Sequence, residues 1–290
     1  MTDLPPLLTR RDVRDLLDEA GLGPRRSLGQ NFVIDPNTIR RIVRLARIEA
    51  GQEVVEIGPG LGSLTLGLLE AGARVLAVEK DAHLARSLGE RLGAAVAAGS
   101  LRVVEGDALD LAWAGRLEGP APIVANLPYN VATTIVIDVL DRVPEVPRLL
   151  VMVQKEVADR MVAGPGSPAH GLPSIRIARR ATARRVGLVG PDVFWPRPRV
   201  DSALVEVERR PDAPALDPVL EAAFVELTRA GFGQRRKTLR RALGAVREPG
   251  RVVAALEEAG LPPDARAEQL DVDEWVGLTR LLAGDAGTAA

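Results

Sequence analysis

The chain has 290 residues, of which 46% are hydrophobic and 27% charged, a composition typical of a globular protein with one large core and room for a satellite domain. It has no cysteine, which excludes disulfides and thiolate metal sites, and no stretch of about 18 apolar residues that could span a membrane. The formal net charge of −1 excludes a uniformly basic surface but not local basic patches. Residues 1–20 carry four aspartates and lack the apolar core of a signal peptide, so we expect a cytoplasmic protein.

Two amphipathic helices are predicted in the N-terminal part of the chain. The first covers residues 9–19, and the second begins at Asp35, with Pro36 in its first position, and ends near residue 48. One face of the second helix is apolar, and the other is basic through Arg40, Arg41, Arg44 and Arg47. This basic face is either solvated or lies along phosphates.

Short apolar runs alternate with helical stretches from residue 53 onward, which is the pattern of βα units. Strands are predicted over residues 54–57, 74–78, 101–104, 123–125 and 149–153. The polar residues Glu79, Asp107 and Asn126 fall at or just beyond the ends of three of these strands. Because ligands bind beyond the carboxyl ends of the strands in open α/β sheets, we expect these side chains to border one site.

The C-terminal part of the chain is predicted to be helical. A proline-spaced segment, residues 194–202, leads into a strand over residues 203–207. Helices follow over residues 218–229, 236–246, 252–259 and 273–282. Residues 210–217 are rich in proline and charge, which is typical of a linker and places a domain boundary there.

A glycine-rich loop follows the first βα strand, with glycines at Gly58, Gly60 and Gly62 that let the backbone approach a ligand at a helix N-terminus. The spacing Gly-x-Gly-x-Gly differs from the Gly-x-Gly-x-x-Gly of dinucleotide enzymes, which disfavours a dehydrogenase. Glu79, about 20 residues after Gly58, can accept both hydrogen bonds of a ribose diol, and Asp107 can accept one from an adenine amino group. Together these residues predict S-adenosylmethionine, an adenosyl ligand with an amino-acid tail.

The run Asn126-Leu127-Pro128-Tyr129 ends a buried strand and suits an extruded adenine. The exocyclic nitrogen of adenine is a poor nucleophile because its lone pair is delocalised into the ring. Hydrogen bonds from its protons to the Asn126 side-chain oxygen and the Leu127 carbonyl would make the nitrogen pyramidal and turn its lone pair toward a methyl sulfonium. Tyr129 can stack on one face of the base and Phe194 on the other. The structural alternatives are an ordinary Asn-Leu-Pro turn and a core phenylalanine.

Two segments are strongly basic. One contains Arg235, Arg236, Lys237, Arg240 and Arg241, whose spacing on a helix makes a stripe that can follow RNA phosphates. The other, residues 175–185, carries five arginines and no acid. A solvated helix face explains one such stripe more readily than two.

The remaining ionisable candidates suggest no metal site. His83 and His170 are the two histidines, and neither belongs to a cluster of carboxylates. Glu56 and Glu156 could be general bases, although helix capping or cofactor orientation is the simpler role for each.

Five segments in order resemble the ribosomal RNA adenine dimethyltransferases of the KsgA type. They are residues 27–32, 56–65, 126–130, 194–202 and 232–240, so the resemblance spans nearly the whole chain after residue 26. It implies a Rossmann-like class I methyltransferase domain, with a mostly parallel seven-stranded sheet and flanking helices, and a small all-helical C-terminal domain. We therefore expect an N-terminal extension (1–26), a methyltransferase domain (27–212) and a helical RNA-binding domain (213–290).

The resemblance also implies site residues and a substrate. It implies that S-adenosylmethionine contacts Asn31, Val33, Gly58, Glu79, Asp107 and Asn126. The implied substrate is a pair of adjacent adenines in a hairpin loop near the 3′ end of small-subunit ribosomal RNA, each methylated twice within an immature particle. Val33 stands where a leucine is expected, and Trp195 is bulkier than the usual residue. We expect a monomer with no metal and no membrane partner.

Two other functions compete with this prediction. One is a large-subunit ribosomal RNA adenine methyltransferase of the macrolide-resistance type, which the basic stripe and the helical C-terminal domain disfavour. The other is a ribosome-assembly factor whose binding outweighs its catalysis.

Overall fold

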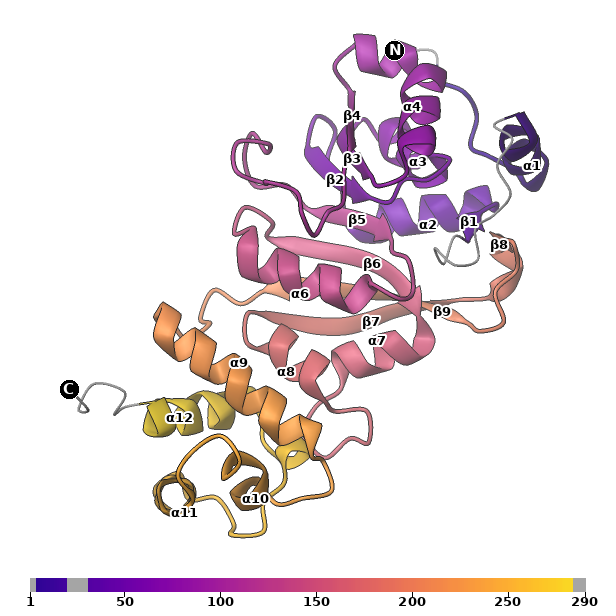
Figure 1. Ribbon diagram of the computed structural model, residues 1–290. Coiled ribbons are helices and arrows are strands. Elements are labelled where there is room, and N and C mark those ends of the chain that lie inside the picture. The colour runs from indigo at the N-terminus through magenta and orange to yellow at the C-terminus, as the bar shows by residue number, and fades with distance from the viewer. Residues whose placement is uncertain (1–3, 20–30, 284–290) are drawn as a thin grey trace. The chain divides into compact units, whose positions relative to one another are not determined.

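A computed structural model of the protein describes residues 4–19 and 31–283 (Figure 1). Most of the first motif, residues 27–30, lies outside the described residues. The contacts divide the chain into two compact units. The first unit comprises residues 1–158 and 183–209, and the second comprises residues 159–182 and 210–290.

The first unit is built on a seven-stranded sheet with the strand order β4-β3-β2-β5-β6-β9-β7. The strands from β4 to β6 pair in parallel, and β9 is antiparallel to β6, so the sheet is mostly parallel, as predicted. Val54 and Val55 of β2 and Ile123 and Val124 of β5 are buried, as central parallel strands require. The strand bounds are β2 (Glu53–Ile57), β3 (Arg74–Glu79), β4 (Leu101–Glu105), β5 (Ile123–Asn126), β6 (Arg148–Gln154), β7 (Ala181–Val189) and β9 (Ser202–Arg209).

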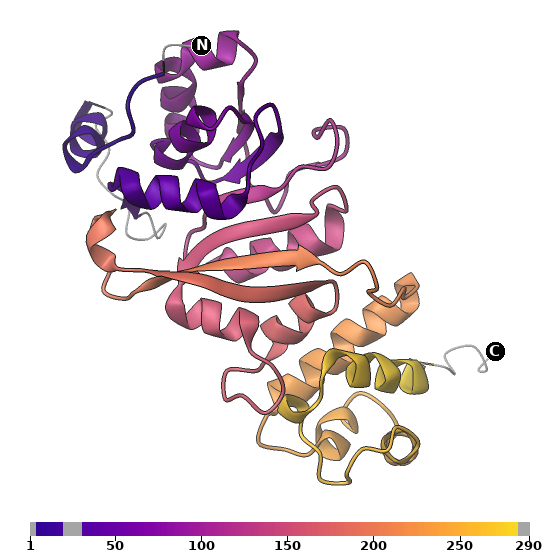
Figure 2. The same ribbon diagram turned by 180° about the vertical axis from the view of Figure 1, so that it is seen from behind.

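Helices flank both faces of this sheet. Helix α6 lies on the face toward the viewer in Figure 1, and α2 lies on the face toward the viewer in Figure 2. The Asp35 carboxylate caps α2 by accepting a hydrogen bond from the Thr38 amide at 2.8 Å, as the sequence predicts. The helix bounds are α1 (Arg10–Glu19), α2 (Pro36–Ala46), α3 (Ser63–Glu70), α4 (Ala82–Arg91), α5 (Gly93–Ala97) and α6 (Ala132–Arg142).

Two features near the N-terminus support the site. Val13 and Leu17 of α1 are buried in the core of the first unit, so the predicted N-terminal extension contributes to that core. A small antiparallel sheet joins β1 (Phe32–Val33) to β8 (Phe194–Trp195), with Val33 opposite Phe194. This pairing brings the chain before α2 next to the proline-spaced segment.

The second unit is helical and packs around the buried side chains of Phe224 and Trp275. Its helices are α8 (Leu172–Ala178), α9 (Pro218–Gly233), α10 (Leu239–Leu243), α11 (Pro249–Glu258) and α12 (Val272–Ala283), and α7 (Lys155–Val162) crosses the boundary between the units. The helix predicted over residues 236–246 is confined to α10. It begins late because the Leu239 amide donates to the Ala265 carbonyl at 2.7 Å.

The compact units differ from the predicted domains in one segment. One division between the units falls at residue 210, and residues 159–182 group with the C-terminal helices. Ile175 of α8 is fully buried in the same cluster as Phe224, and the Arg179 guanidinium forms a 2.6 Å ion pair with Glu221 of α9. These long-range contacts, which no local pattern encodes, hold the segment in the helical unit.

The contact of α2 with α3 predicts opposite effects for two glycine substitutions. A Cβ on Gly67 of α3 would lie 2.3 Å from Ile39 Cγ2, whereas a Cβ on Gly89 of α4 would meet no atom within 4 Å. We expect Gly67→Ala to lower the free energy of unfolding by roughly 1–3 kcal/mol through overpacking. The matched control Gly89→Ala should raise it by up to about 1 kcal/mol, because alanine favours the helix. Urea unfolding measures both, and stabilisation by Gly67→Ala would contradict the tight contact.

Candidate active site

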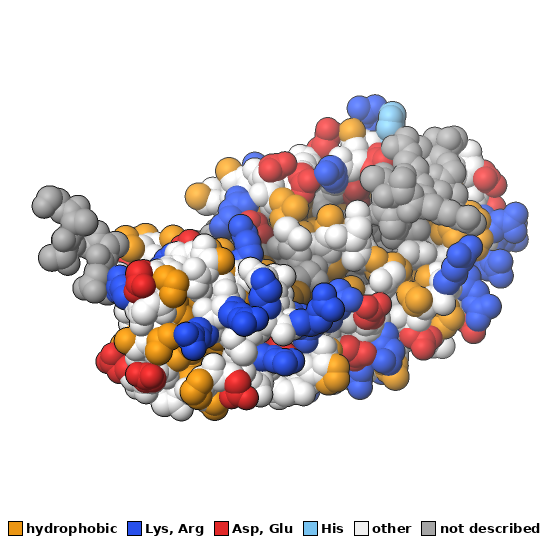
Figure 3. Space-filling view, turned by 60° about the horizontal axis from the view of Figure 1, so that its bottom comes forward, with side chains coloured by type: hydrophobic (Ala, Val, Ile, Leu, Met, Phe, Trp, Pro, Cys, Tyr) orange, Lys and Arg blue, Asp and Glu red, His pale blue; other side chains and the backbone are white. Residues whose placement is uncertain are grey.

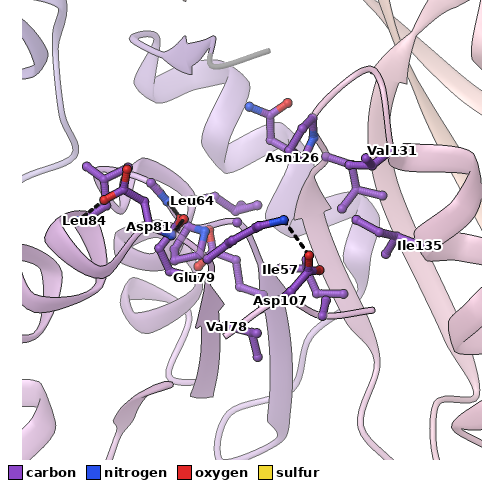
Figure 4. A pocket seen from close by; sticks show the side chains of 18 of the residues that line it. Ile57, Leu64, Val78, Glu79, Asp81, Leu84, Asp107, Asn126, Val131 and Ile135 are labelled. Carbon is purple, nitrogen blue, oxygen red and sulfur yellow. Dashed lines mark hydrogen bonds and ion pairs between the residues drawn. The ribbon is translucent and has the colours of Figure 1, made fainter. Parts of the chain in front are cut away.

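A cavity of about 530 Å³ lies beyond the carboxyl ends of β2, β3, β4 and β5 (Figure 4). Strand β2 pairs with β3 on one side and β5 on the other, so the cavity lies where the strand order reverses. All predicted cofactor residues and most predicted catalytic residues line it. They are Asn31, Val33, Gly58, Gly60, Glu79, Asp107, Asn126, Leu127, Pro128 and Tyr129.

The glycine-rich loop forms one wall, and its backbone requires glycine. Gly58, Gly60 and Gly62 have φ values of 70°, 56° and 81°, in the left-handed region. A Cβ on Gly60 would lie 3.0 Å from the Phe32 ring, and one on Gly62 would lie 2.5 Å from Leu88 Cδ1. The loop therefore keeps its backbone close to the cavity only with these residues.

Glu79 at the end of β3 is oriented by two backbone donors. The Gly60 amide donates to Glu79 Oε2 at 3.0 Å, and the Asp81 amide donates to Oε1 at 2.9 Å. Burial raises the pKa of the Glu79 carboxyl, and these hydrogen bonds oppose the rise. Each oxygen keeps a second lone pair, so the carboxylate can accept both hydrogen bonds of a diol.

Asp107, after β4, is an ionised acceptor. Lys80 Nζ lies 2.7 Å from Asp107 Oδ2, and this contact lowers the pKa of the Asp107 carboxyl. The Leu109 amide donates to Oδ1 at 3.0 Å. Arg142, in the last turn of α6, donates to the carbonyls of Leu109 and Leu111 and thereby anchors the loop. No sequence pattern singled out Lys80 or Arg142, because their roles depend on tertiary contacts.

Asn126, the last residue of β5, has a fixed amide orientation. Its Nδ2 donates to the Asn31 carbonyl at 3.0 Å, which identifies Oδ1 as the free acceptor of this side chain. Within the described part of the chain, neither Asn126 Oδ1 nor the Leu127 carbonyl receives a hydrogen bond. Two adjacent residues that line the cavity thus each keep an acceptor oxygen, as the proposed chemistry at an amino group requires.

The two aromatic residues predicted to stack on the base have different surroundings. Tyr129 is half-buried, lines the cavity, and places its hydroxyl 2.9 Å from Ser202 Oγ. Burial raises the pKa of the Tyr129 phenol. Phe194 is 2% exposed, belongs to the hydrophobic core and does not line the cavity. The structure therefore places Phe194 in the core, in accord with the structural alternative, because β8 pairs with β1 and turns this side chain inward.

Glu56 lies beneath the glycine-rich loop and is 1% exposed. Thr65 Oγ1 donates to its Oε2 at 2.6 Å. Burial raises the pKa of Glu56 to about 8, the Thr65 hydrogen bond opposes this rise, and the negative charge of Glu79 adds to it. The burial of Glu56 and its hydrogen bond to Thr65 favour a structural role over that of a general base.

The predicted RNA-binding side chains belong to the second unit and are exposed. Arg236 and Lys237 lie in a turn, and Arg240 and Arg241 lie in α10, so the stripe is only partly helical. Among the described residues, none of these four or Arg235 has an ion-pair partner. Figure 3, which turns the α10–α11 side of the unit forward, shows Lys and Arg side chains gathered on this face.

Arginines of the second basic segment form ion pairs within the protein. Arg179 is 3% exposed, and both Arg179 and Arg180 form ion pairs with Glu221. Arg184 forms an ion pair with Glu206, a buried residue of β9 that also pairs with Arg47, the residue after α2. Three of the five arginines in residues 175–185 thus have carboxylate partners from distant parts of the sequence, which disfavours a second phosphate-binding stripe there.

Residues 4–19 and 31–283 contain no group of three or more His, Asp or Glu side chains that could hold a metal ion. No helix in these residues is long and apolar enough to cross a membrane.

The fold and the site together define a class I methyltransferase, and solved structures share this fold. A dimethyladenosine transferase from Plasmodium falciparum matches with a TM-score of 0.72 and 22% identity, over 85% of this chain and 95% of the other. The 23S rRNA methyltransferase ErmE matches with a TM-score of 0.63 and 27% identity, over 87% and 99%.

The family model described as ribosomal RNA adenine dimethylase matches residues 22–283, and the chain belongs to this family. Proteins from Kineococcus radiotolerans and Leifsonia xyli, each called ribosomal RNA small subunit methyltransferase A, are both 50% identical to it. The matches cover 99% of this chain and 95% of the first relative, and 94% of this chain and 97% of the second. The predicted family, fold class, enzyme class and cofactor, S-adenosylmethionine, are thus confirmed.

The buried Glu56 predicts a pH-dependent stability. Its pKa in the folded chain, about 8, lies above that of an unfolded glutamate, so folding favours the protonated form. The contribution of the protonated Glu56 carboxyl to the free energy of unfolding is complete below about pH 4.5 and is lost as the pH rises to about 8. We expect Glu56→Gln, which keeps an acceptor for Thr65, to be more stable than the wild type at pH 9 by a few kcal/mol at most. Urea unfolding at pH 5 and pH 9 measures the difference. An equal loss of unfolding free energy between pH 5 and pH 9 in the wild type and in Glu56→Gln would contradict the raised pKa of Glu56.

Proposed function

We propose that the protein transfers methyl groups from S-adenosylmethionine to the N6 atoms of two adjacent adenines in the 3′-terminal hairpin loop of small-subunit ribosomal RNA. Each adenine is dimethylated while the ribosomal particle is still immature, and the enzyme acts as a monomer. The family match and the names of the relatives from Kineococcus and Leifsonia support the RNA class. The observation that carries the chemistry is the pair of acceptors at Asn126 and Leu127 beside a stacking tyrosine.

The residues of the cavity fit S-adenosylmethionine. Glu79 is oriented to accept from the ribose hydroxyls, and Asp107 is an ionised acceptor for the adenine amino group. The backbone at Gly58 and Gly60 leaves room for the amino-acid tail, because no Cβ closes that wall. When bound, the cofactor supplies an electrophilic methyl group on a sulfonium.

The chain's own residues prepare the target nitrogen. Asn126 Oδ1 and the Leu127 carbonyl each accept a hydrogen bond from its N–H groups and hold its lone pair out of the base plane. Tyr129 stacks on the extruded base, and stacking of about 1–3 kcal/mol offsets part of the cost of unstacking the base from RNA. No strong base is needed, because the nitrogen becomes acidic once it carries positive charge.

Methyl transfer to defined particles tests the function. The protein is incubated with labelled cofactor and with immature small subunits or large subunits from a strain that lacks the enzyme, and the RNA is digested to nucleosides. We expect labelled dimethyladenosine from the small subunit only. Label in the large subunit would instead support the macrolide-resistance type, for which the likeness to ErmE is the motivating observation.

Asn126→Ala separates catalysis from binding. Removing Oδ1 takes away one of two aligned acceptors, so we expect the rate of methyl transfer to fall by about 100-fold. Binding to the immature particle, measured by sedimentation, should persist. Normal particle maturation in cells that carry this variant would support the assembly-factor alternative, and wild-type methylation by the variant would contradict the role of Asn126.

Arg236 and Arg240 should contribute to the salt dependence of RNA binding. Replacing both with glutamine should reduce the slope of log affinity against log salt concentration by about 2 if each contacts one phosphate. Arg10→Gln with Arg14→Gln is a matched control, because these exposed arginines on α1 carry the same charge. Equal slopes for both double variants would rule out phosphate contacts at Arg236 and Arg240.

A further inference from the structure

Ser202 connects the end of the sheet to the stacking residue. It is the first residue of β9 and is fully buried, and its Oγ lies 2.9 Å from the Tyr129 hydroxyl. Within residues 4–19 and 31–283 this is the only hydrogen bond of the Ser202 side chain. A buried hydroxyl with one polar partner has its hydrogen bond directed to that partner.

The backbone around Ser202 is held firmly. Strand β9 pairs with β6 in an unbroken antiparallel register, from Ser202 opposite Gln154 to Glu208 opposite Arg148. The intervening residues of both strands are almost all buried. The backbone of Ser202 therefore has a fixed position in the first unit.

The backbone next to Tyr129 is held by hydrogen bonds of its own. The Leu127 amide donates to the Met152 carbonyl at 3.1 Å, and the Pro128 carbonyl accepts from the Val131 and Ala132 amides at the start of α6. These bonds fix the turn but leave rotation about the side-chain torsions of Tyr129. The contact with Ser202 restrains the Cα–Cβ torsion by holding the phenol oxygen, and this fixes where the ring lies.

We propose that Ser202 is a positioning residue for methyl transfer, whose hydroxyl holds the ring of Tyr129 in the orientation that stacks on the target adenine. The inference rests on the proposed function, since it assigns a purpose to the stacking ring. A ring that is oriented before the base arrives loses less freedom on binding, so the contact favours capture of the base. It leaves the cofactor untouched, because Ser202 does not line the cavity.

Tyr129 is the only tyrosine of the 290 residues, which makes the contact directly observable. Incorporation of 3-fluorotyrosine gives the protein a single ¹⁹F resonance. In Ser202→Ala we expect this resonance to move toward that of free fluorotyrosine and its linewidth to change, because the phenol loses its partner. An identical resonance in both proteins would overturn the proposal.

Kinetics with the unlabelled full-length protein test the consequence. For Ser202→Ala we expect kcat/KM for immature small subunits to fall about 5-fold, which corresponds to one hydrogen bond, and KM for S-adenosylmethionine to stay within twofold. Tyr129→Phe keeps the ring, removes the same contact and should show the same pattern. The double variant should lose no more than either single variant, because both remove one interaction.

The outcomes separate this inference from the proposed function. The positioning role is wrong if the wild type methylates small subunits and both single variants are as active as the wild type. It is also wrong if the losses of the two single variants add in the double variant. If the wild type methylates no small-subunit RNA, the proposed function fails and the stacking role of Tyr129 fails with it. Ser202→Thr, which keeps the hydroxyl, should restore both the ¹⁹F resonance and kcat/KM, and this rescue would exclude a merely structural effect of losing the serine.

Discussion

Parallel pairing of β2 with β3 on one side and with β5 on the other brings the loops that follow these strands to one edge of the sheet. The glycine-rich loop follows β2, Glu79 ends β3 and Asn126 ends β5, and they form a site because the register places these strand ends at the same edge of the sheet. Almost all residues of these strands are buried, so the packing that stabilises the fold also fixes the geometry of the site.

Three carboxyl groups near this edge differ in charge state because their surroundings differ. Glu56 is buried against a threonine and favours its protonated form, whereas Asp107 is paired with Lys80 and stays ionised. Glu79 is intermediate: its burial is opposed by backbone amides that orient its oxygens. The cavity thus presents the ionised Asp107 where a ligand can reach it, and the buried Glu56 carboxyl keeps its proton at neutral pH.

The sequence was sufficient for features that depend on short-range pattern. Alternating βα units, a capped helix at Asp35 and polar residues at strand ends were all predictable, because each follows from neighbouring residues. The burial of Phe194, the pairing of Arg179 with Glu221 and the late start of α10 at Leu239 were not predictable. Each depends on a partner far away in the sequence, which neither periodicity nor residue type reveals. Ser202 shows the same limit, since its motif was visible but its contact with Tyr129 was not.

The chain passes between the two units more than once, because residues 159–182 belong to the helical unit although they precede β9. The helical unit is therefore not a detachable C-terminal module. A protein truncated after residue 209 would keep α8 but lose the helix against which Ile175 is buried, and would expose an apolar surface prone to aggregation. Expression of the helical unit by itself would need residues 159–182 reconnected to residue 210 by a designed linker.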